Sequence, residues 1–525
     1  MPARRLSVAA GSRLVTTDIS LPDRGPHLRR AGSIRRPGPS YEEYRWSVRV
    51  RMVVVSAAVM LVALAGCGAD PVVRTAPLRS PPPTPAEEPE QLFPRSGTTA
   101  YDVDRYDVDL AYDPKSGTMK ANAWITGKAN ERLDGISLDF GRMEIAGVTV
   151  NEVPAAAVVQ RGGKLHVTPA APLALGAPFV LTVAYSGIPE VRADPSLGSP
   201  VGWIRTAKGS YTNLAPNGSG TWLPTNDTPG DKAVFRLRLT VSDPFEAVAN
   251  GVLVSREKTA GQVTTIWEMP EPMAPSELQV TIGQLGRLDT TSPGGHTLMN
   301  FVAAGAPDPA PALAVAGQMI DYFGRRFGPY PFTTAGLTVV DAPAGLAVAA
   351  QGRPLVSTAD MAAPVSSHQH GVLATALAHQ WFGAAVTPAR WQDVWLREGF
   401  TTYARWLWME EAGLQRVDDA AANALARTNG MRAAFGTPDH PTADNLSSPS
   451  VADGGAVALH ALRETVGDTK FFTILRRWVA EHHGKSATTD DFIDHASDVV
   501  GEDLTGLFLT WLSSSEVPAE FPSGA

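Results

Sequence analysis

The sequence of 525 residues predicts an α+β fold in which a β-rich domain precedes a helical domain. Apolar residues alternate with polar ones at a period of two between about residues 101 and 288. From Ala312 onward apolar residues instead recur at helical spacing. A proline-rich stretch over residues 81–89 separates this folded part from an apolar run nearer the N-terminus. We expect the β domain to cover residues 98–288 and the helical domain residues 289–525.

The first 51 residues contain eleven Arg or Lys residues and four Asp or Glu residues, without periodic apolar positions. This composition indicates a disordered extension or a start codon placed too early, and we favour the misplaced start. Removing these residues from the totals of 45 basic and 53 acidic residues leaves 34 and 49, a net charge of about −15. Such an acidic chain is not expected to bind nucleic acid or an anionic membrane surface.

Residues 52–66 carry no charge, follow Arg49 and Arg51, and end at Cys67, the only cysteine. This run is shorter than the roughly 18 residues that a transmembrane helix needs, and it has the basic flank and small-residue exit of an export signal. Leu64-Ala65-Gly66-Cys67 resembles a bacterial lipobox. We therefore expect a lipoprotein signal peptide over residues 52–66, a lipid on Cys67, and a protein anchored to the extracytoplasmic face of the cell membrane. The alternative is that Cys67 is a small buried residue.

Residues 67–97 are expected to form a tether, because Pro81–Pro83, Pro85 and Pro89 favour an extended, semi-rigid chain. With a single cysteine in the chain, no intramolecular disulfide can form. The stability of the folded part must therefore come from its core.

Three strands are predicted most clearly by the alternation, and several helices by apolar faces. The alternating residues are Tyr106, Val108, Leu110 and Tyr112; Phe235, Leu237, Leu239 and Val241; and Leu278, Val280 and Ile282. The helical faces are Val315, Met319, Tyr322 and Phe323, then Phe471, Leu475, Trp478 and Val479. Thr488, ahead of Asp490 and Asp491, is a candidate N-cap for a last helix through Val499. We expect His482-His483 to cap or follow a helix end, and Ser447–Ser450 to be a loop.

Residues 375–383 read Thr-Ala-Leu-Ala-His-Gln-Trp-Phe-Gly, and Glu398 follows within Trp395-Leu396-Arg397-Glu398-Gly399-Phe400. In the zinc motif His-Glu-x-x-His, two histidines one helical turn apart bind the metal and the Glu activates water. His379 matches the second histidine, and Glu398 stands where the gluzincin aminopeptidases, which these segments resemble, have the third ligand. Thr375, however, stands at the first histidine, where a neutral hydroxyl is a poor zinc ligand, and Ala376 stands at the base.

These segments resemble the gluzincin aminopeptidases of the membrane alanyl aminopeptidase type. The further matching segments are Phe327–Phe332, Pro224–Asp227 with Asp231–Ala233, Met273–Pro275, and Gly455-Ala456 before Leu459–Arg463. The resemblance runs from about Tyr101 to the C-terminus. It implies a saddle-like β-sandwich domain followed by a thermolysin-like, α-rich metallopeptidase domain.

The resemblance also implies that two more site groups are missing. The family pattern Gly-Ala-Met-Glu-Asn, whose Glu holds the α-amine of the substrate, corresponds to Leu346–Ala350, so Ala349 stands at the carboxylate. The Tyr of the pattern Tyr-x-x-Gly-Ala, which donates a hydrogen bond to the developing oxyanion, corresponds to Ala452. No catalytic residue of the family is therefore intact, although the motifs around the site remain.

Replacements from nearby in the sequence are poor. His368 and His370 precede His379 by eleven and nine positions, so on a continuous helix neither reaches the position of the metal. Asp393 is close in sequence, but it is only a weak candidate for a substitute base.

We therefore predict an aminopeptidase-like lipoprotein with a degenerate zinc site, a pseudoenzyme that binds a peptide or a partner protein without cleaving it. The remnant ligands His379 and Glu398 are expected to hydrogen-bond to each other or to Thr375, and zinc binding is expected to be weak or absent. The alternative is an active zinc metallopeptidase, an aminopeptidase with ligands recruited from elsewhere in the fold. A chain that keeps the fold without any function in the cleft is a further alternative.

Overall fold

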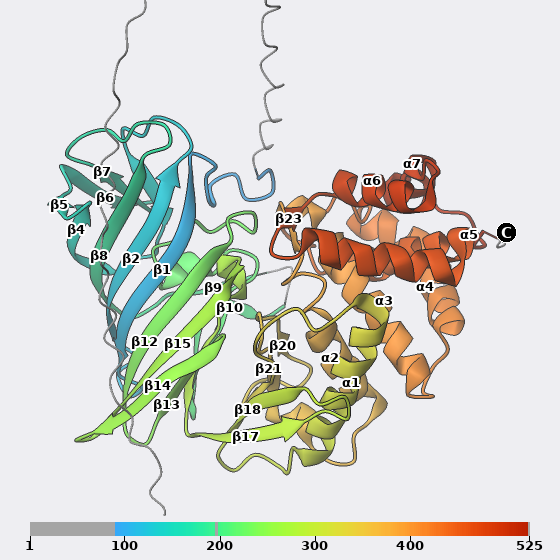
Figure 1. Cartoon of the computed structure of the whole chain (residues 1–525), viewed down its shortest axis with the longest axis horizontal. Helices are drawn as coiled ribbons and strands as arrows, with labels where there is room; N and C mark the ends of the chain where they lie inside the picture. The colour runs from blue at the N-terminus through green and yellow to red at the C-terminus, as the bar shows by residue number, and fades with distance from the viewer. Residues whose placement is uncertain (1–89, 195–197, 523–525) are drawn as a thin grey trace, which may run out of the picture. The chain divides into compact units, whose positions relative to one another are not determined.

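The computed structural model describes residues 90–194 and 198–522 (Figure 1). Cys67, the predicted signal peptide and most of the predicted tether lie outside the described residues, so these predictions stay predictions. Within the described part, no helix combines the length and the apolar character needed to cross a membrane.

The largest element of the β-rich part is an eight-stranded sheet in the order β14-β15-β12-β1-β2-β8-β4-β5. Its strands are β1 (Tyr101–Tyr112), β2 (Met119–Ala129), β4 (Glu144–Val150), β5 (Val153–Pro154), β8 (Pro178–Gly187), β12 (Ala233–Ser242), β14 (Val252–Thr259) and β15 (Gln262–Met273). β1 pairs in parallel with β12, placing Tyr106 opposite Phe235 with the ring centroids 4.8 Å apart. The alternating residues of β1 and β12 are buried, as the period of two predicts.

Two smaller sheets complete this part. One contains β3 (Ile136–Asp139), β7 (Lys164–Thr168) and β6 (Ala157–Arg161), in that order. The other runs β13 (Glu246–Ala249), β16 (Val280–Gly283), β11 (Gly209–Asn213), β10 (Pro200–Thr206) and β9 (Val191–Ala193). Trp203 of β10 lies 5.0 Å from the ring of Tyr112 in β1, so side chains of the five-stranded and eight-stranded sheets share one buried core.

A mixed five-stranded sheet leads into the helical part. Its strands, in spatial order, are β17 (Leu285–Thr291), β18 (Thr297–Ala303), β19 (Thr338–Val340), β21 (Leu355–Ser357) and β20 (Ala347–Val348). The expected boundary between residues 288 and 289 falls inside β17. A short parallel pair, β22 (Thr387–Pro388) with β23 (Ser486–Ala487), links two distant segments of the helical part.

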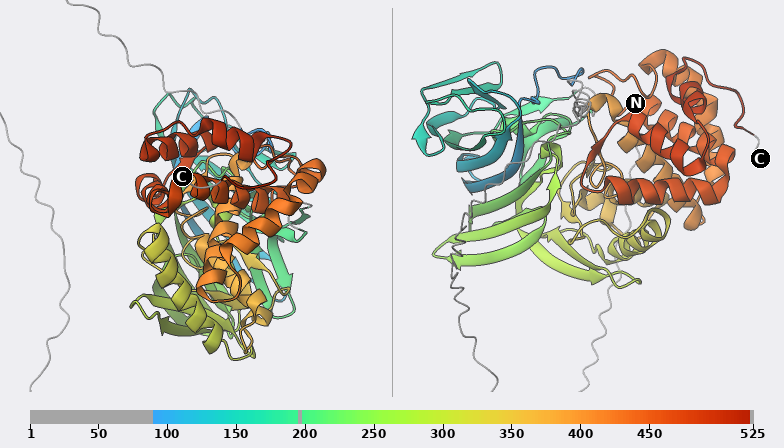
Figure 2. Two further views of the ribbon diagram at one scale, coloured as in Figure 1. Left: turned by 90° about the vertical axis from the view of Figure 1, so that its right-hand side faces the viewer. Right: turned by 45° about the horizontal axis from the view of Figure 1, so that its top comes forward.

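The helical part is drawn in yellow to red (Figure 2). Its helices are α1 (Ala310–Phe327), α2 (Ser367–Ala378), α3 (Trp395–Glu411), α4 (Val417–Phe435), α5 (Pro449–His482), α6 (Thr489–Val500) and α7 (Thr505–Phe508). Short 3₁₀ turns are η1 (Ser219–Thr221), η2 (Pro275–Glu277), η3 (Thr358–Met361) and η4 (Trp391–Asp393), and η5 (Leu509–Ser513) is a π turn. α3 packs against α2, α4 and α5. The predicted order, a β-rich domain followed by an α-rich one, is confirmed.

Helix ends follow the sequence signals in part. Thr488 caps α6 and forms a capping box with Asp491, and α5 ends at His482, as expected. The expectation of a loop over Ser447–Ser450 is wrong for its second half. The side chain of Ser448 accepts from the Val451 amide, and Pro449 occupies the first helical position of α5, where its missing N–H is not needed.

Two glycines bring α3 and α5 into backbone contact. A Cβ added at Gly399 would lie 2.9 Å from the Gly455 backbone, so neither position has room for a side chain. Glu398 in α3 and Ala452 in α5 flank this crossing. The helix packing therefore fixes the spacing of two positions that the sequence assigns to the site.

Candidate functional site

The helix α2 carries Thr375 and Ala376, and His379 forms its C-cap. The hydroxyl of Thr375 donates to the carbonyl of Gly371, one turn earlier, at 3.0 Å. Ala376 is buried with 3% of its surface exposed, so the position of the general base is filled by a methyl group in the core. Ala376 thus supplies no proton acceptor, and Thr375 offers only a neutral hydroxyl, which is a poor zinc ligand beside imidazole.

His379 is paired with Glu277, a residue that none of the sequence motifs includes. Its Nε2 lies 2.9 Å from both carboxylate oxygens, and both side chains are at least 96% buried. An ionised carboxylate only accepts hydrogen bonds, so Nε2 must be the donor and carry the hydrogen. The lone pair that a metal would require at this nitrogen is therefore not available in this arrangement.

The backbone around Glu277 is held by two local features. Pro275 begins the turn η2, and the amide of Glu277 donates to the carbonyl of Ala274 at 2.9 Å. The side-chain amide of Asn250 donates to the carbonyl of Glu277 at 3.1 Å. The carboxylate therefore projects from a fixed turn rather than from a free loop.

Neighbouring cations keep Glu277 ionised. Burial by itself would raise the pKa of Glu277, but His379, Arg397 and Lys232 together hold it below its ordinary value. Lys232 donates to the carbonyl of Ala384 at 2.8 Å, and burial lowers its pKa to about 7 despite the attraction of Glu277. His379, Arg397 and Lys232 thus lie close enough to favour the ionised form of Glu277.

Glu398 has a partner of its own. Its Oε1 lies 3.2 Å from Nε of Arg397, the preceding residue in α3. The expectation that His379 and Glu398 hydrogen-bond to each other or to Thr375 is therefore wrong. His379 pairs with Glu277, Glu398 with Arg397, and the Thr375 hydroxyl with the backbone. The physical reason is that Glu277 offers His379 an ionised acceptor at 2.9 Å, and Arg397 offers Glu398 a cationic donor at 3.2 Å.

The two other positions at which the family has a functional side chain are Ala349 and Ala452, and both lack a polar group. Ala349 directly follows β20, and Ala452 lies in the first turn of α5. Both are partly exposed, and a methyl group can neither bind an amine nor donate to an oxyanion.

The nearby His and Asp side chains that are candidates to replace the missing groups interact with other residues instead. α2 begins at Ser367 and so extends through His368 and His370, which puts both out of reach of His379, as expected. His370 accepts from the Trp408 indole at 3.0 Å. Asp393 accepts from the amide and hydroxyl of Thr489 at the start of α6, at 3.0 and 2.8 Å. It is thus a helix-capping group and not a substitute base.

The donor set does not fit zinc. Among the residues that the structure describes, no group of three or more His, Cys, Asp or Glu side chains is arranged to hold a metal ion. A catalytic zinc site needs three protein ligands. Here the one imidazole at the site is bonded to a carboxylate, and the hydroxyl that replaces the other is bonded to the backbone.

A cavity of about 540 Å³ opens beside Thr375. It lies between α2, α3 and the segment that leads into β20, and its walls include Ala347, His368, Val372, Thr375, Arg405 and Trp406. Of the described residues that line it, none is Asp or Glu. This cavity includes Thr375, the replaced metal-ligand position, whereas His379, Glu398, Ala349 and Ala452 are not among its lining residues.

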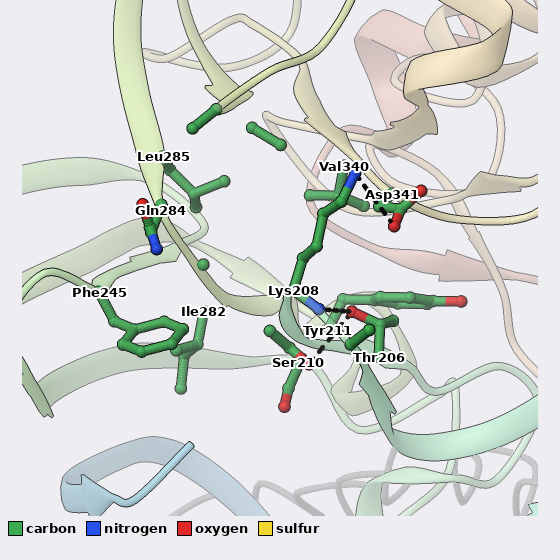
Figure 3. Close-up of a pocket in the computed structure, with 15 residues that line it drawn as sticks. Thr206, Lys208, Ser210, Tyr211, Phe245, Ile282, Gln284, Leu285, Val340 and Asp341 are labelled. Atoms are coloured by element: carbon green, nitrogen blue, oxygen red, sulfur yellow. Dashed lines mark hydrogen bonds and ion pairs between the residues drawn. The ribbon is translucent and has the colours of Figure 1, made fainter. Parts of the chain in front are cut away.

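A second, smaller pocket of about 230 Å³ lies within the β-rich part and near the end of β19 (Figure 3). Lys208 reaches Asp341 across its rim at 3.4 Å, and Tyr211, Phe245, Ile282 and Leu285 form much of its wall. None of its lining residues comes from α2, α3 or α5. It is therefore separate from the positions that the zinc motif identifies.

Known proteins match this architecture over most of its length. Residues 102–276 match the Peptidase M1 N-terminal domain, and residues 312–511 match the Peptidase family M1 domain. An M1 zinc metallopeptidase from Deinococcus radiodurans is 29% identical with a TM-score of 0.74, covering 83% of this chain and 99% of that one. A mutant of a two domain M1 zinc metallopeptidase bound to L-arginine is 30% identical, with the same TM-score and coverage.

Longer relatives match as well. The glutamyl aminopeptidase of Bitis rhinoceros is 26% identical over 354 residues, 61% of this chain and 36% of that protein. Aminopeptidase M1-B of Oryza sativa subsp. japonica is 26% identical over 317 residues, 56% of this chain and 36% of that protein. The matched region thus spans a little over a third of these two relatives. Because the two-domain structure at 30% identity is covered almost completely, the chain belongs to the M1 peptidase family, that of the gluzincin aminopeptidases.

Proposed function

We propose that this protein is a non-catalytic M1 family member, a pseudopeptidase that binds a peptide or a segment of a partner protein in the cavity beside Thr375. The observation that carries the proposal is the hydrogen bond from Nε2 of His379 to Glu277. With its hydrogen directed to the carboxylate, this nitrogen has no lone pair free to bind a metal. Ala376, Ala349 and Ala452 add support, since each stands where the family has a reacting or binding group.

The first test is metal content and turnover measured on the same sample. Protein purified without chelator is analysed for zinc and assayed with aminoacyl and peptide substrates, beside an active two-domain M1 enzyme as the positive control. We expect negligible zinc and no hydrolysis. Near-stoichiometric zinc together with hydrolysis that is lost in His379→Ala would overturn the proposal.

The alternative function, an active metallopeptidase with a rebuilt site, is favoured by one observation. Glu277 brings a carboxylate to His379 that could serve as a ligand if the pair rearranged. That function requires Nε2 of His379 to lose its hydrogen and Glu277 to turn toward a metal. The zinc and turnover measurements above separate the two functions directly.

Binding itself is tested with a small peptide. A mutant of the Deinococcus radiodurans relative is described in complex with the substrate Tyr-Ser-Ala, which makes this tripeptide a suitable first probe here. We expect it to bind without being cleaved, and we expect Thr375→Trp, which fills the cavity, to abolish binding. Tight binding to Thr375→Trp would place the ligand elsewhere.

We also propose that Cys67 carries a lipid that anchors the protein at the extracytoplasmic face of the cell membrane. The support is the uncharged run of residues 52–66 behind Arg49 and Arg51, ending in the lipobox-like Leu64–Cys67. Metabolic labelling with palmitate should tag the wild type and fail with Cys67→Ala. A labelled Cys67→Ala variant would refute the assignment.

A further inference from the structure

The cavity beside Thr375 presents the opposite charge from the one that an aminopeptidase needs. An enzyme that removes N-terminal residues must hold a positively charged α-amine, and the family position for that carboxylate is Ala349 here. The titratable residues that line the cavity are Arg405 and His368. A cationic end of a peptide would therefore meet no anionic wall.

Arg405 reaches this cavity from α3. It follows Glu398 by seven positions, two helical turns along the same face. Its Cδ lies 3.6 Å from where a Cβ at Gly371 would stand, one turn before Thr375 in α2. The side chain thus packs over the glycine of α2, and Arg405 and Thr375 line the same cavity.

The guanidinium of Arg405 is poorly satisfied by the protein. Its nearest carboxylate is Asp453, at 3.9 Å, and that carboxylate also accepts a hydrogen bond from Arg427 at 3.3 Å. Within the described residues, the Arg405 guanidinium makes no hydrogen bond. Burial lowers the pKa of Arg405, with Asp453 opposing that effect only partly. One carboxylate is therefore shared by two arginines, and the donors of Arg405 remain available.

The rest of the wall is suited to an apolar group. Val372, Trp406 and Met409 line the cavity beside Arg405. His368 lies at the exposed side, with Nε2 at 3.5 Å from Asp360. A ligand that fits both features carries a carboxylate and an adjacent apolar side chain.

We propose that this cavity binds the free carboxyl terminus of a peptide, with the carboxylate on Arg405 and the last side chain against Trp406 and Met409. The inference rests on the proposed function and names its ligand class. A guanidinium binds a carboxylate through two parallel hydrogen bonds, which gives both affinity and orientation. An aminopeptidase holds the N-terminal end of its peptide, whereas this cavity binds the C-terminal end.

Isothermal titration of the full-length protein in detergent tests the inference with three probes. They are N-acetyl-Ala-Phe with a free carboxylate, the same peptide as its C-terminal amide, and Ala-Phe-amide with a free α-amine. We expect the acid to bind at least about tenfold more tightly than either amide, because only it can pair with Arg405. Equal binding of acid and amide, or tightest binding of the free amine, would overturn the carboxylate assignment.

Variants connect the preference to Arg405. Arg405→Gln should bring the acid and amide peptides to equal affinity. Arg405→Lys should keep part of the difference in affinity, because lysine keeps the positive charge but lacks the two parallel N–H donors of the guanidinium. Arg325→Gln is the matched control, since Arg325 pairs with Glu411 at the end of the same helix and does not line the cavity. Circular dichroism melts confirm that each variant is folded, and if Arg405→Gln does not fold, the wild-type comparison of acid with amide decides.

The outcomes separate this inference from the proposed function. Equal binding of all three peptides without hydrolysis would leave a binding pseudopeptidase but remove the carboxylate preference. Failure of all three to bind would overturn the carboxylate inference. Zinc with turnover in the same sample would overturn the proposed function, whatever the peptide preference.

Discussion

Glu277 and His379 lie 102 positions apart in the sequence, yet Nε2 of His379 is 2.9 Å from both oxygens of Glu277. Glu277 follows the last long strand of the β-rich part, and His379 ends α2 of the helical part. A side-chain pair thus joins the two parts at the position where active relatives would need a metal ligand. The pair is a buried contact between the two parts.

The pair predicts a large loss of stability when one partner is removed. Glu277→Gln keeps the shape but leaves a buried imidazole without its ionised acceptor, and we expect the free energy of unfolding to fall by roughly 3 kcal/mol. Urea unfolding measures it, with the exposed Glu257→Gln as the control. A loss no larger than that of the control would show that the pair contributes little.

Competition between Glu277 and a metal gives a second prediction. Thr375→His restores two imidazoles one turn apart, but His379 remains bonded to Glu277. We expect Thr375→His combined with Glu277→Ala to bind zinc at least about tenfold more tightly than Thr375→His alone. Chelator competition measures the two affinities, and neither variant should hydrolyse peptides because Ala376 is unchanged. Equal zinc affinities would mean that Glu277 does not compete.

Gly383 yields a third prediction, because it lies against the ring of His379. A Cβ at this residue would stand 2.3 Å from Cε1 of His379, and its φ of +121° disfavours any side chain. We expect Gly383→Ala to cost more than about 2 kcal/mol in unfolding free energy, whereas Gly413→Ala has open space and should cost less. Both glycines have positive φ, so the backbone strain of an added Cβ is common to the two variants. The difference in their thermal unfolding therefore measures the cost of the contact with His379.

Asp453 gives a prediction about the ligand. It is the carboxylate nearest to Arg405, and it would compete with a bound carboxylate for the guanidinium. Asp453→Asn should therefore raise the affinity for the peptide with a free carboxylate several-fold and leave the affinity for its C-terminal amide unchanged. Titration of the two peptides against this variant checks it, and weaker binding of the acid would count against the role given to Arg405.

His460 in α5 predicts how stability changes with pH. Burial first, and then Arg463, lowers the pKa of His460 to about 4. In the unfolded chain the imidazole takes up its proton near pH 6.5, so the folded state is fully favoured above that pH and loses up to roughly 3 kcal/mol as the pH falls from about 6.5 to about 4. His460→Gln should flatten the dependence of unfolding free energy on pH over this window. A dependence as steep in His460→Gln as in the wild type would contradict this assignment.

The order of the domains was predictable because it depends on local periodicity. Alternation over Tyr106–Tyr112 and the cap at Thr488 both reflect residues close in sequence. The motifs also placed Thr375 and His379 correctly on one helix, and the helix through His368 excluded the nearby histidines.

Partners at the site were harder to predict because they come from distant segments. Nothing near His379 in the sequence points to Glu277. The available signal was an acidic residue two positions after Met273-Ala274-Pro275 and just before an apolar strand, a place where a charge needs a buried partner. The start of α5 is a different case, because the composition of Ser447–Ser450 predicts a loop, whereas Ser448 and Pro449 form a cap and a first helical residue.

The backbone contact between Gly399 and Gly455 lets the fold persist while the side chains at the site change. Because the crossing of α3 and α5 depends on two residues without side chains, the adjoining positions can exchange one functional group for another while their spacing stays fixed. The side chain at Ala452 can therefore differ between relatives without disturbing the architecture. The same crossing makes this chain a suitable host for a designed site, because the contact of the two glycines holds α3 and α5 at a fixed spacing.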